Sequence, residues 1–577
     1  MPDLQKLFFA VLLCCSWMFP ARTWAQCSSY GGSQLGLIVP ATRTSTTVNT
    51  VTASNYVRVA VIRGIQYTVS STLNNLAVTD SSGGSPQASS GTSLIYTAVY
   101  SGYIRLYNCN ASAVNLSVSI PTSTTAIGGS NTEDSKTAAG TNGWREHLYQ
   151  RLDNTGGVPT DVNAFSRYLG YRDTITGETF TNSFVGPGGT YALKSGGRYL
   201  ILNTPEFFAV QYRMQSTRPA GAYLADMNGD DGVRLTVDGT LYFNRWREQS
   251  NSFYTKQLFP LSGNSNLLFE YYESTGGNDV GFTNFSRVSN AISGPGPSTD
   301  TTVCNNTAIS FSGNNTFSDA PISAASIISV AYQWAVSANG NAYTNISGAT
   351  TQNYSTGALS PGTYQYRRTA TISRFNSGMQ ANDSMPTKTS VPDLSNIIKV
   401  TVRPTPAATL TSGGSVCRNA IANLTVTNPQ TIPVTVNYSS SGTVTGSGSV
   451  VVPGSGTATI PFSTTTPGSS TVTLTNVAYT TTPSCSTALS GVTTTVTVRP
   501  LPAGTITTNT PICLGAAGRL TFTSTSGTSP FSIIVNGTTY NGIVSGTPFN
   551  ITPNPATSGT LSYDLTKITD ANGCVSP

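Results

Sequence analysis

Short runs in which apolar and polar residues alternate recur along the whole chain. Residues 56–62, 67–70 and 103–107 are examples near the N-terminus, and glycine and serine turns separate them. A period of two places the apolar side chains on one face of an extended strand. The pattern therefore predicts half-buried β-strands joined by turns, and an all-β fold class made of tandem β-sandwich domains.

An internal repeat organises the C-terminal half of the chain. Residues 400–404 and 496–500 both read Val-Thr-Val-Arg-Pro, and Cys417 and Cys513 follow them at the same distance. The repeated arginines, Arg403 and Arg499, are 96 positions apart, as are the two cysteines. A β-sandwich domain has about 100 residues. We therefore predict that each run is the last strand of a module and that its proline ends the strand.

The module before this repeat carries aromatic residues at informative places. Trp334 lies in an alternating segment, and residues 362–368 and 395–402 form two further strand-like segments. Together these segments resemble the immunoglobulin-like and PKD-like repeats of large bacterial surface proteins. The resemblance implies that Trp334 is a core residue and that Tyr364 or Tyr366 lies near a tyrosine corner. The ending at residues 568–577 also resembles repeats of secreted adhesins, in which further modules follow.

Turn-rich segments and shifts in composition divide the chain. Only 9% of the residues are charged, while Thr, Ser, Gly and Asn dominate, a composition that suits exposed faces of β-sheets and turns. Aromatic and charged residues concentrate between residues 142 and 290. The predicted division is a signal peptide at 1–25, an N-terminal β-sandwich at 26–128, a distinct β-sandwich at 140–292, and immunoglobulin-like modules at 298–404, 405–500 and 501–577.

The first residues predict export. Lys6 precedes an apolar run at residues 7–19, and Thr23-Trp24-Ala25 is an acceptable cleavage pattern that leaves Gln26 as the new N-terminus. The run is too short to span a bilayer, and no later segment approaches the roughly 18 apolar residues that a membrane span needs. We expect a secreted or cell-surface protein without a transmembrane segment. The formal net charge of +6 comes without a basic cluster, so nucleic acid is not an expected partner.

Seven cysteines follow the signal peptide, and their isolated spacing argues against zinc, which favours close pairs. In an oxidising compartment they predict one disulfide for each of three modules. The predicted pairs are Cys27 with Cys109, Cys417 with Cys485, and Cys513 with Cys574. Cys304 is then left over, either as a buried thiol or as a partner for a cysteine outside the chain.

Residues 226–239 hold the densest group of oxygen-bearing side chains: Asp226, Asn228, Asp230, Asp231 and Asp238. Such oxygens repel one another unless a hard cation, typically Ca²⁺, or backbone N–H groups hold them. Calcium is thus the first hypothesis, and a plain solvated turn is the second, because Asp and Asn are ordinary turn residues.

The spacing excludes an EF-hand. Asp226, Asn228 and Asp230 fit the first, third and fifth positions of such a loop. The sixth position requires glycine but holds Asp231, and the twelfth requires glutamate but holds Val237.

A wider set of segments suggests a different calcium chemistry. Residues 208–213, 221–225, 229–239 and 267–273, with Trp246, resemble in their order the protective-antigen (PA14) module. The resemblance covers about one quarter of the chain and implies a β-sandwich. In members of the family that bind carbohydrate, two adjacent aspartates joined by a cis peptide bind calcium, and the ion holds sugar hydroxyls. Asp230 and Asp231 match this pair.

The remaining ligands of this type of site match less closely. Lectin members add an asparagine from a later loop, and the corresponding residues here are 273–280. In place of that asparagine, the resemblance implies that Glu273, Asn278 or Asp279 completes the metal site, with Asn278 and Glu273 as the predicted ligands. Trp246 has two interpretations, a platform on which a sugar ring stacks or a core residue under the sheet.

The chain offers little for catalysis. His147 is the only histidine, which excludes metal sites with two histidines, and we expect it to be a packing or surface residue. Glu270, Glu273 and the Asp230 cluster are the candidate carboxylates for glycosidase chemistry, but aspartates that hold calcium are poor proton donors. We expect no enzymatic activity.

Two functions of different kinds follow. One is an adhesin-like protein in which a calcium-dependent module binds an extracellular polysaccharide or the glycans of a glycoprotein. The other is a purely structural surface scaffold. A non-catalytic accessory part of a longer secreted hydrolase is a third possibility.

Overall fold

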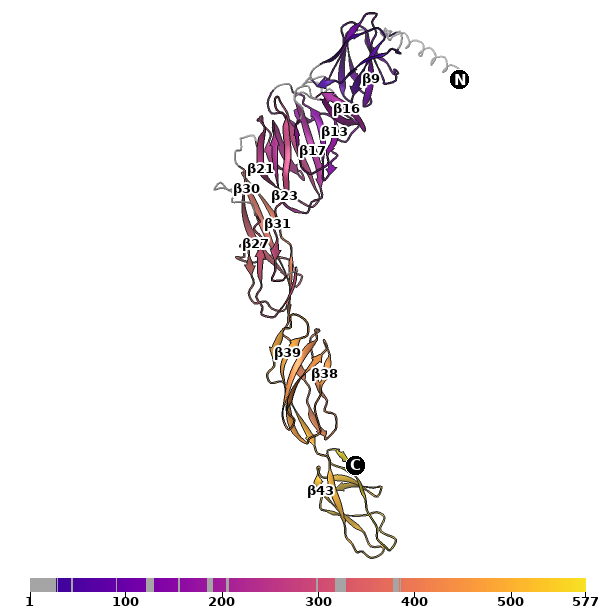
Figure 1. Ribbon diagram of the computed structural model, residues 1–577, viewed down its shortest axis with the longest axis vertical. Helices are drawn as coiled ribbons and strands as arrows, with labels where there is room; N and C mark the ends of the chain where they lie inside the picture. Colours follow the sequence, from indigo (N-terminus) through magenta and orange to yellow (C-terminus); the bar gives the residue numbers. More distant parts are fainter. Residues whose placement is uncertain are drawn as a thin grey trace, which may run out of the picture.

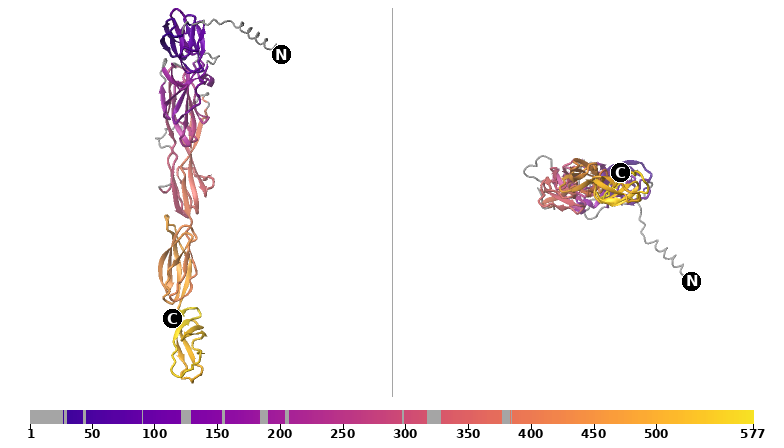
Figure 2. Two further views of the ribbon diagram at one scale, coloured as in Figure 1. Left: turned by 90° about the vertical axis from the view of Figure 1, so that its right-hand side faces the viewer. Right: turned by 90° about the horizontal axis from the view of Figure 1, so that it is seen from below.

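The computed structural model describes residues 27, 30–42, 45–89, 91–120, 129–153, 156–183, 190–203, 207–296, 299–316, 328–376, 383 and 385–577. These residues form many strands in several separate sheets and one short helix, which confirms the predicted all-β class of tandem β-sandwiches. The predicted signal peptide at 1–25 lies outside the described residues. The modules follow one another along a single long axis (Figures 1 and 2).

The first module is a β-sandwich whose second sheet runs on into the next module. One sheet has the order β1-β4-β9-β6-β7, and β2, β3, β5, β8 and β10 lie on the other. Asn203 of the second module pairs in parallel with Ala41, which makes one continuous sheet across the junction. The strands are β1 Gln34–Ile38, β2 Ala41–Thr42, β3 Thr46–Val51, β4 Tyr56–Val61, β5 Gln66–Ser71, β6 Leu76–Thr79, β7 Gln87–Ser89, β8 Ser93–Thr97, β9 Gly102–Asn108 and β10 Val114–Ile120.

The second module packs two sheets around an aromatic core. Strands β20-β19-β22-β17-β12-β13 form one sheet and β14-β23-β18-β21 form the other. The ring of Trp144 lies between them, 5.1 Å from Phe282 and 6.4 Å from Phe269 between ring centroids. The elements are β11 Gly140–Thr141, β12 Trp144–Gln150, α2 Asp161–Phe165, β13 Arg167–Ile175, β14 Phe180–Ser183, β15 Thr190–Ser195, β16 Arg198–Asn203, β17 Phe208–Ser216, β18 Gly221–Gly229, β19 Gly232–Val237, β20 Thr240–Arg245, β21 Ser252–Leu261, β22 Ser265–Tyr272 and β23 Asp279–Arg287.

The third module has the predicted core. Trp334 is fully buried, and its indole N–H donates to the carbonyl of Thr351 at 2.9 Å. Tyr364 donates to the carbonyl of Ser360 at 3.0 Å, a tyrosine-corner contact as predicted. The strands are β24 Ile292–Ser293, β25 Asp300–Cys304, β26 Ser310–Gly313, β27 Ile328–Ala338, β28 Thr344–Asn345, β29 Tyr354–Ser355, β30 Gly362–Phe375, β31 Lys388–Leu394 and β32 Ile398–Arg403.

The fourth and fifth modules repeat this arrangement of a small and a larger sheet. The fourth contains β33 Thr409–Leu410, β34 Gly414–Cys417, β35 Leu424–Thr427, β36 Val434–Gly442, β37 Gly446–Val452, β38 Thr457–Ile460, β39 Gly468–Tyr479, β40 Ser486–Ala488 and β41 Thr493–Arg499. The fifth contains β42 Ala503–Thr508, β43 Arg519–Ser526, β44 Phe531–Val535, β45 Thr538–Ile543, β46 Pro548–Asn550, β47 Leu565–Thr569 and β48 Val575–Ser576. The two Val-Thr-Val-Arg runs are the last strands β32 and β41, as predicted.

Polar contacts and apolar packing hold the second and third modules together. Asp393 of the third module accepts the backbone N–H of Ala222 at 3.1 Å and the guanidinium of Arg287 at 3.1 Å. Ala222 and Leu258 of the second module also share a buried apolar cluster with Ile372 and other residues of the third. The second module is therefore fixed to the next one by a packed interface.

Disulfides join successive modules in the C-terminal half. Cys27 pairs with Cys109 inside the first module, as predicted. Cys304 of the third module, however, pairs with Cys485 of the fourth, and Cys417 of the fourth pairs with Cys574 of the fifth. The predicted pairs Cys417–Cys485 and Cys513–Cys574 are therefore wrong, and so is the prediction that Cys304 is left over. Cys513 is a free, exposed cysteine.

The geometry of the modules explains this pairing. Strand β39 runs the length of the fourth module, with Gly468 beside Val498 at one end and Tyr479 beside Cys485 at the other. Cys417 lies at the Val498 end, because it pairs with Arg499. A strand of this length spans roughly 35 Å, whereas disulfide-bonded Cα atoms lie within about 7 Å. The two cysteines of one module are thus too far apart to bond.

An arginine reinforces the junction between the third and fourth modules. Arg403 donates from one guanidinium nitrogen to the carbonyls of Thr481 at 2.8 Å and Pro483 at 2.9 Å. Its guanidinium also lies 5.5 Å from the ring centroid of Tyr479, whose hydroxyl donates to Pro404 at 3.0 Å. The C-terminal end of the third module is therefore hydrogen-bonded to residues 479–483 of the fourth module, next to the Cys304–Cys485 disulfide.

Disulfide mapping tests these junctions. Digestion of the unreduced full chain should yield peptides that link Cys304 to Cys485 and Cys417 to Cys574, because only these pairs lie at the same junction. The Cys27–Cys109 peptide serves as the internal control, since that bond lies within one module. Recovery of a Cys417–Cys485 peptide from freshly purified protein would contradict the arrangement.

Candidate functional site

Asp230 and Asp231 form the turn between β18 and β19, which lie in opposite sheets of the second module. The turn therefore crosses the end of the sandwich. Asp231 is buried and Asp230 is half-buried, and the peptide bond that joins them is cis. The hydroxyl of Tyr271, on β22, donates to the carbonyl of Asp230 at 2.6 Å.

A second crossing loop, residues 273–278, is bound to this turn at both of its ends. The N–H of Ser274 donates to Asp231 Oδ2 at 2.8 Å, and the N–H of Asp230 donates to the carbonyl of Asp279 at 2.9 Å. Between these two bonds, Gly277 lies directly against the carboxylate of Asp230. A methyl group at Gly277 would lie 2.3 Å from Asp230 Oδ2, so glycine leaves the space that the carboxylate occupies.

A third crossing loop, between β20 and β21, completes the arrangement. The N–H of Gln249 donates to Asp231 Oδ1 at 3.2 Å, and its amide nitrogen donates to the carbonyl of Asp231 at 2.8 Å. The amide of Asn251 donates to Asp279 Oδ2 at 3.2 Å. Sequence reasoning missed Gln249 and Asn251, although polar residues directly after Trp246 were a signal for a loop at this end.

Burial and crowding disfavour the negative charges at this turn. Burial is the main reason why the pKa of Asp231 rises to about 6, and the carboxylates of Asp230 and Glu248 add to the effect. The N–H groups of Ser274 and Gln249 oppose it. The pKa of Asp230 is also raised, first by burial and then by Asp279. A cation at this place would relieve the repulsion.

The available donors suit calcium in kind. Ca²⁺ takes six to eight oxygen ligands from carboxylates, amides, carbonyls and water. The turn places the carboxylates of Asp230 and Asp231 here, and Asn278, which follows Gly277 in the second loop, is buried. Among the residues that the structure describes, no three His, Cys, Asp or Glu side chains gather closely enough to bind a metal by themselves. A calcium ion would therefore depend on amide, carbonyl and water oxygens as well.

Glu273 and Trp246, two predicted site residues, lie in the interior. Glu273 is 1% exposed, and its Oε2 accepts the hydroxyl of Tyr271 at 2.8 Å. Trp246 is 8% exposed, donates to the carbonyl of Pro159 at 3.0 Å, and packs against Tyr272. These contacts favour the core interpretation of Trp246 over a sugar-stacking platform.

The other two aspartates of this segment, Asp226 and Asp238, accept hydrogen bonds from residues of neighbouring strands. Asp226 accepts the N–H of Lys256 at 2.6 Å and the amide of Asn284 at 2.6 Å. Asp238 accepts the N–H of Asn266 at 2.8 Å in a hairpin. The amide of Asn228 donates to Asn251 Oδ1 of the third loop at 3.0 Å. Of the five oxygen-bearing residues seen in the sequence, Asp230 and Asp231 have contacts with the second loop.

His147 is a packing residue, as expected. It is fully buried, with one ring nitrogen 3.0 Å from the hydroxyl of Tyr168 and the other 2.6 Å from the carbonyl of Ala138. Burial, with a smaller contribution from Arg213, lowers its pKa to about 4. The ring is therefore neutral near pH 7.

The family that matches in sequence covers one module of the chain. Residues 296–404 match the model of a family described as a domain of unknown function (DUF8696). No curated protein matches the chain in sequence. Within the part of the chain that the structure describes, no helix is long and apolar enough to cross a membrane.

Similar solved structures include two PA14 domains. The chain is 15% identical to the PA14 domain of the MpAFP antifreeze protein, over 27% of this chain and 87% of that one, with a TM-score of 0.20. It is 16% identical to a PA14 sugar-binding domain from an RTX adhesin, over 25% of this chain and 88% of that one, with a TM-score of 0.18. The FN1–FN3 domains of chicken CNTN1 are 12% identical, over 48% of this chain and 91% of that one, with a TM-score of 0.17. These likenesses are too distant to assign a function.

The burial of His147 predicts a pH dependence of stability. Its pKa is about 4 in the folded chain and 6.5 as a free side chain, so the unfolded state binds more protons between these values. The contribution of His147 is complete above pH 6.5 and is lost as the pH falls toward 4, by about 3 kcal/mol at most. Urea unfolding of the full chain, followed by tryptophan fluorescence at pH 7.5 and 4.5, measures the loss.

The variant His147→Gln isolates this effect, because glutamine keeps hydrogen-bonding groups but does not titrate. The raised pKa of Asp231 acts in the opposite direction and is common to both proteins, so it cancels in the difference. An equal pH dependence in the variant and the parent would refute the assignment.

Proposed function

We propose that this is an exported surface protein whose second module binds a calcium ion and, through that ion, an extracellular glycan. One observation carries the proposal: at the end of the sandwich the carboxylate of Asp230 lies against Gly277 of a second loop, and that of Asp231 accepts the N–H of Ser274 in the same loop. Carboxylates that are close together and partly or fully buried form an environment suited to a hard cation.

Asp230, Asp231 and Asn278 would hold the ion. Glu273 is not needed for this role, because it is engaged with Tyr271 in the interior. Calcium keeps part of its coordination shell for exchangeable oxygen ligands. Neighbouring hydroxyl groups of a sugar, on a polysaccharide or on a glycoprotein, are ligands of this kind. The ion would supply this coordination, while the chain supplies a rigid frame from three crossing loops.

The immunoglobulin-like modules serve as a stalk in this account. Disulfides at two junctions and the packed contact between the second and third modules support a role in holding the binding module away from an attachment point. These disulfides also favour an oxidising, extracellular location. The purely structural scaffold is the alternative, and it requires that neither calcium nor glycans bind.

We infer that the protein acts by binding and not by catalysis. His147 is buried and hydrogen-bonded, which leaves it unsuited to proton transfer at a surface site. This reasoning concerns the present chain alone. The same binding module could also serve a separate catalytic partner, as the accessory part of a hydrolase.

Replacing both aspartates tests the proposed function. Asp230→Asn with Asp231→Asn should weaken calcium binding about tenfold or more, because the ion loses its charged ligands. Glycan binding should then be lost, because the glycan is bound through the ion. Isothermal titration of the full chain with CaCl₂ and a glycan array with and without EDTA provide the measurements.

Asp161→Asn is the matched control, since Asp161 is in the same module with 70% of its side chain exposed and lies outside the crossing loops. The control should bind calcium as the parent does. If the parent chain bound neither calcium nor any glycan, the proposed function would be refuted and the structural scaffold would be the remaining alternative.

A second variant tests the loop without removing a carboxylate. Gly277→Ala places a methyl group 2.3 Å from Asp230 Oδ2, so the carboxylate or the loop must shift and calcium affinity should fall severalfold. Gly156→Ala is the control, because a methyl group at Gly156 would lie 3.7 Å from its nearest neighbour, Glu248 Oε1, which is an ordinary van der Waals distance. Unchanged calcium affinity in Gly277→Ala would show that the loop does not take part.

A further inference from the structure

In the third and fourth modules, an early strand lies parallel to the last strand and ends beside it. Strand β25 pairs with β32, and Cys304 lies opposite Arg403. Strand β34 pairs with β41, and Cys417 lies opposite Arg499. The chain leaves each module directly after these arginines. Each early strand therefore ends in a cysteine at the exit of its module, and that cysteine is bonded to the next module.

Each of these two junctions thus has two covalent connections, the chain itself and a junction disulfide. The first junction disulfide is Cys304–Cys485 and the second is Cys417–Cys574. At the first junction the two connections are adjacent. Tyr479 donates its hydroxyl to the carbonyl of Pro404, where the chain crosses, and its N–H to the carbonyl of Cys485.

Two short segments connect these junctions across the fourth module. Residues 404–417 lead from the crossing of the chain at the first junction to the second disulfide, and residues 485–499 lead from the first disulfide to the crossing of the chain at the second junction. Each segment can extend to about 50 Å, whereas the folded module spans roughly 35 Å along β39. Unfolding the rest of the module therefore lengthens the connection by only about 15 Å.

The third module is bypassed in the same way. Strands β24 and β25 lead from the packed interface with the second module to Cys304, so a pull at that interface reaches the fourth module through the first junction disulfide. The cysteines of the two disulfides are separated in sequence by 181 and 157 positions. The two loops of chain overlap, since Cys417 lies inside the first and Cys485 inside the second. Either disulfide alone therefore keeps the covalent path short.

We propose that the C-terminal half of the chain is a tension-bearing tether, in which the two junction disulfides carry a stretching force past the folded modules. The modules follow one axis, so that a pull along it acts on both junctions (Figure 1). Such a pull runs along β25, through the first disulfide and along β41. The hydrogen bonds between the parallel strands are not sheared, because both strands of each pair are attached to the next module at the same end.

The work that a force does on a module is the force multiplied by the length gained. Without the disulfides, unfolding of residues 404–499 would lengthen the chain by about 300 Å. With them, the gain of about 15 Å leaves the force little work to do on unfolding. This mechanical property is independent of calcium and glycan binding, which concern the second module.

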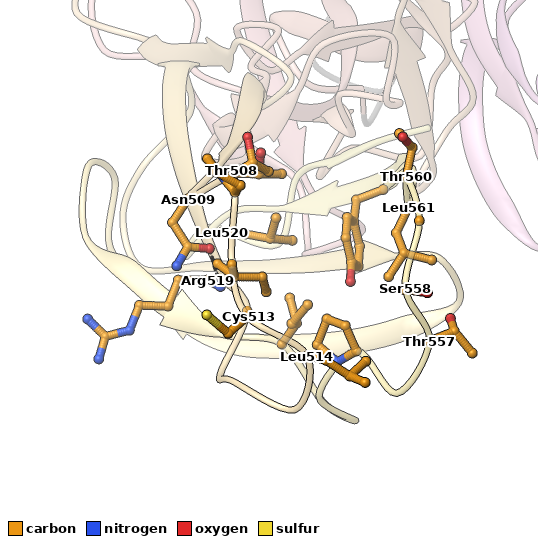
Figure 3. Close-up of a pocket in the computed structure, with 18 residues that line it drawn as sticks. Thr508, Asn509, Cys513, Leu514, Arg519, Leu520, Thr557, Ser558, Thr560 and Leu561 are labelled. Atoms are coloured by element: carbon orange, nitrogen blue, oxygen red, sulfur yellow. Dashed lines mark hydrogen bonds between the residues drawn. The ribbon is translucent and has the colours of Figure 1, made fainter.

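Single-molecule stretching of the full chain, held by handles at its two ends, tests the proposal. Cys513 is free and exposed on the wall of a surface pocket (Figure 3). Cys513→Ser is made in every sample, the parent included, so that this thiol cannot exchange with the disulfides. The second module contains no cysteine and should lengthen by roughly 450 Å on unfolding in every sample, which verifies that the chain is being stretched.

A four-serine variant removes the tension path. With Cys304→Ser, Cys417→Ser, Cys485→Ser and Cys574→Ser, the third to fifth modules should unfold in separate steps of roughly 200 to 350 Å. At the same forces, the parent should lengthen by no more than about 20 Å for each of these modules, because the short segments become taut first.

The final lengths test the overlap of the two loops and do not require that a variant folds. Fully stretched, the four-serine variant should exceed the parent by about 600 Å, since a loop with a separation of 181 positions is released. Removal of one disulfide, by Cys304→Ser with Cys485→Ser or by Cys417→Ser with Cys574→Ser, should add less than about 100 Å.

Three results would each overturn the proposal. The first is equal final lengths of the parent and the four-serine variant. The second is a set of steps of about 200 Å or more from the third to fifth modules of the parent at the forces that unfold them in the four-serine variant. The third is a gain of several hundred ångströms after the loss of a single disulfide.

Discussion

The attachment of the second crossing loop, residues 273–278, to the Asp230–Asp231 turn is the interaction on which the proposed function depends. Two hydrogen bonds fix this loop, one from the N–H of Ser274 to the Asp231 carboxylate and one from the N–H of Asp230 to the carbonyl of Asp279. Between them, Gly277 is held against the Asp230 carboxylate. Without these bonds the two aspartates would be ordinary turn residues in solvent.

The end of the second module that carries the three crossing loops is held rigid by the two packed sheets of the module and by its contacts with the neighbouring modules. The three crossing loops leave strands that pack around Trp144, and the second module is joined to the first by a shared sheet and to the third by a buried interface. A site made of loops that rise from packed strands keeps its geometry better than a site on one free loop. The chain thus presents a preformed group of oxygen atoms near one end of a long series of modules.

Much of the fold could be predicted because its signals are local. Alternation of apolar and polar residues identified the strands, and the repeated Val-Thr-Val-Arg-Pro run identified the last strands β32 and β41. Trp334 and Tyr364 occupy the places that an immunoglobulin-like core requires. The adjacent aspartates were also visible, because their chemistry depends on neighbouring residues in the sequence.

The remaining features depend on contacts between distant segments. The disulfides were assigned to single modules because spacing in the sequence does not reveal that the two cysteines of a module lie at opposite ends of it. Gln249 and Asn251 reach the site only because β20 and β21 lie in different sheets.

A crystal structure of the chain grown with millimolar CaCl₂, with anomalous scattering recorded to identify calcium, tests the central claim most directly. The account predicts one ion between the carboxylates of Asp230 and Asp231, with the amide oxygen of Asn278 among its ligands and exchangeable water on the solvent side. An absence of anomalous density at this turn, with the Asp231 carboxylate bound only by the N–H groups of Ser274 and Gln249, would contradict it.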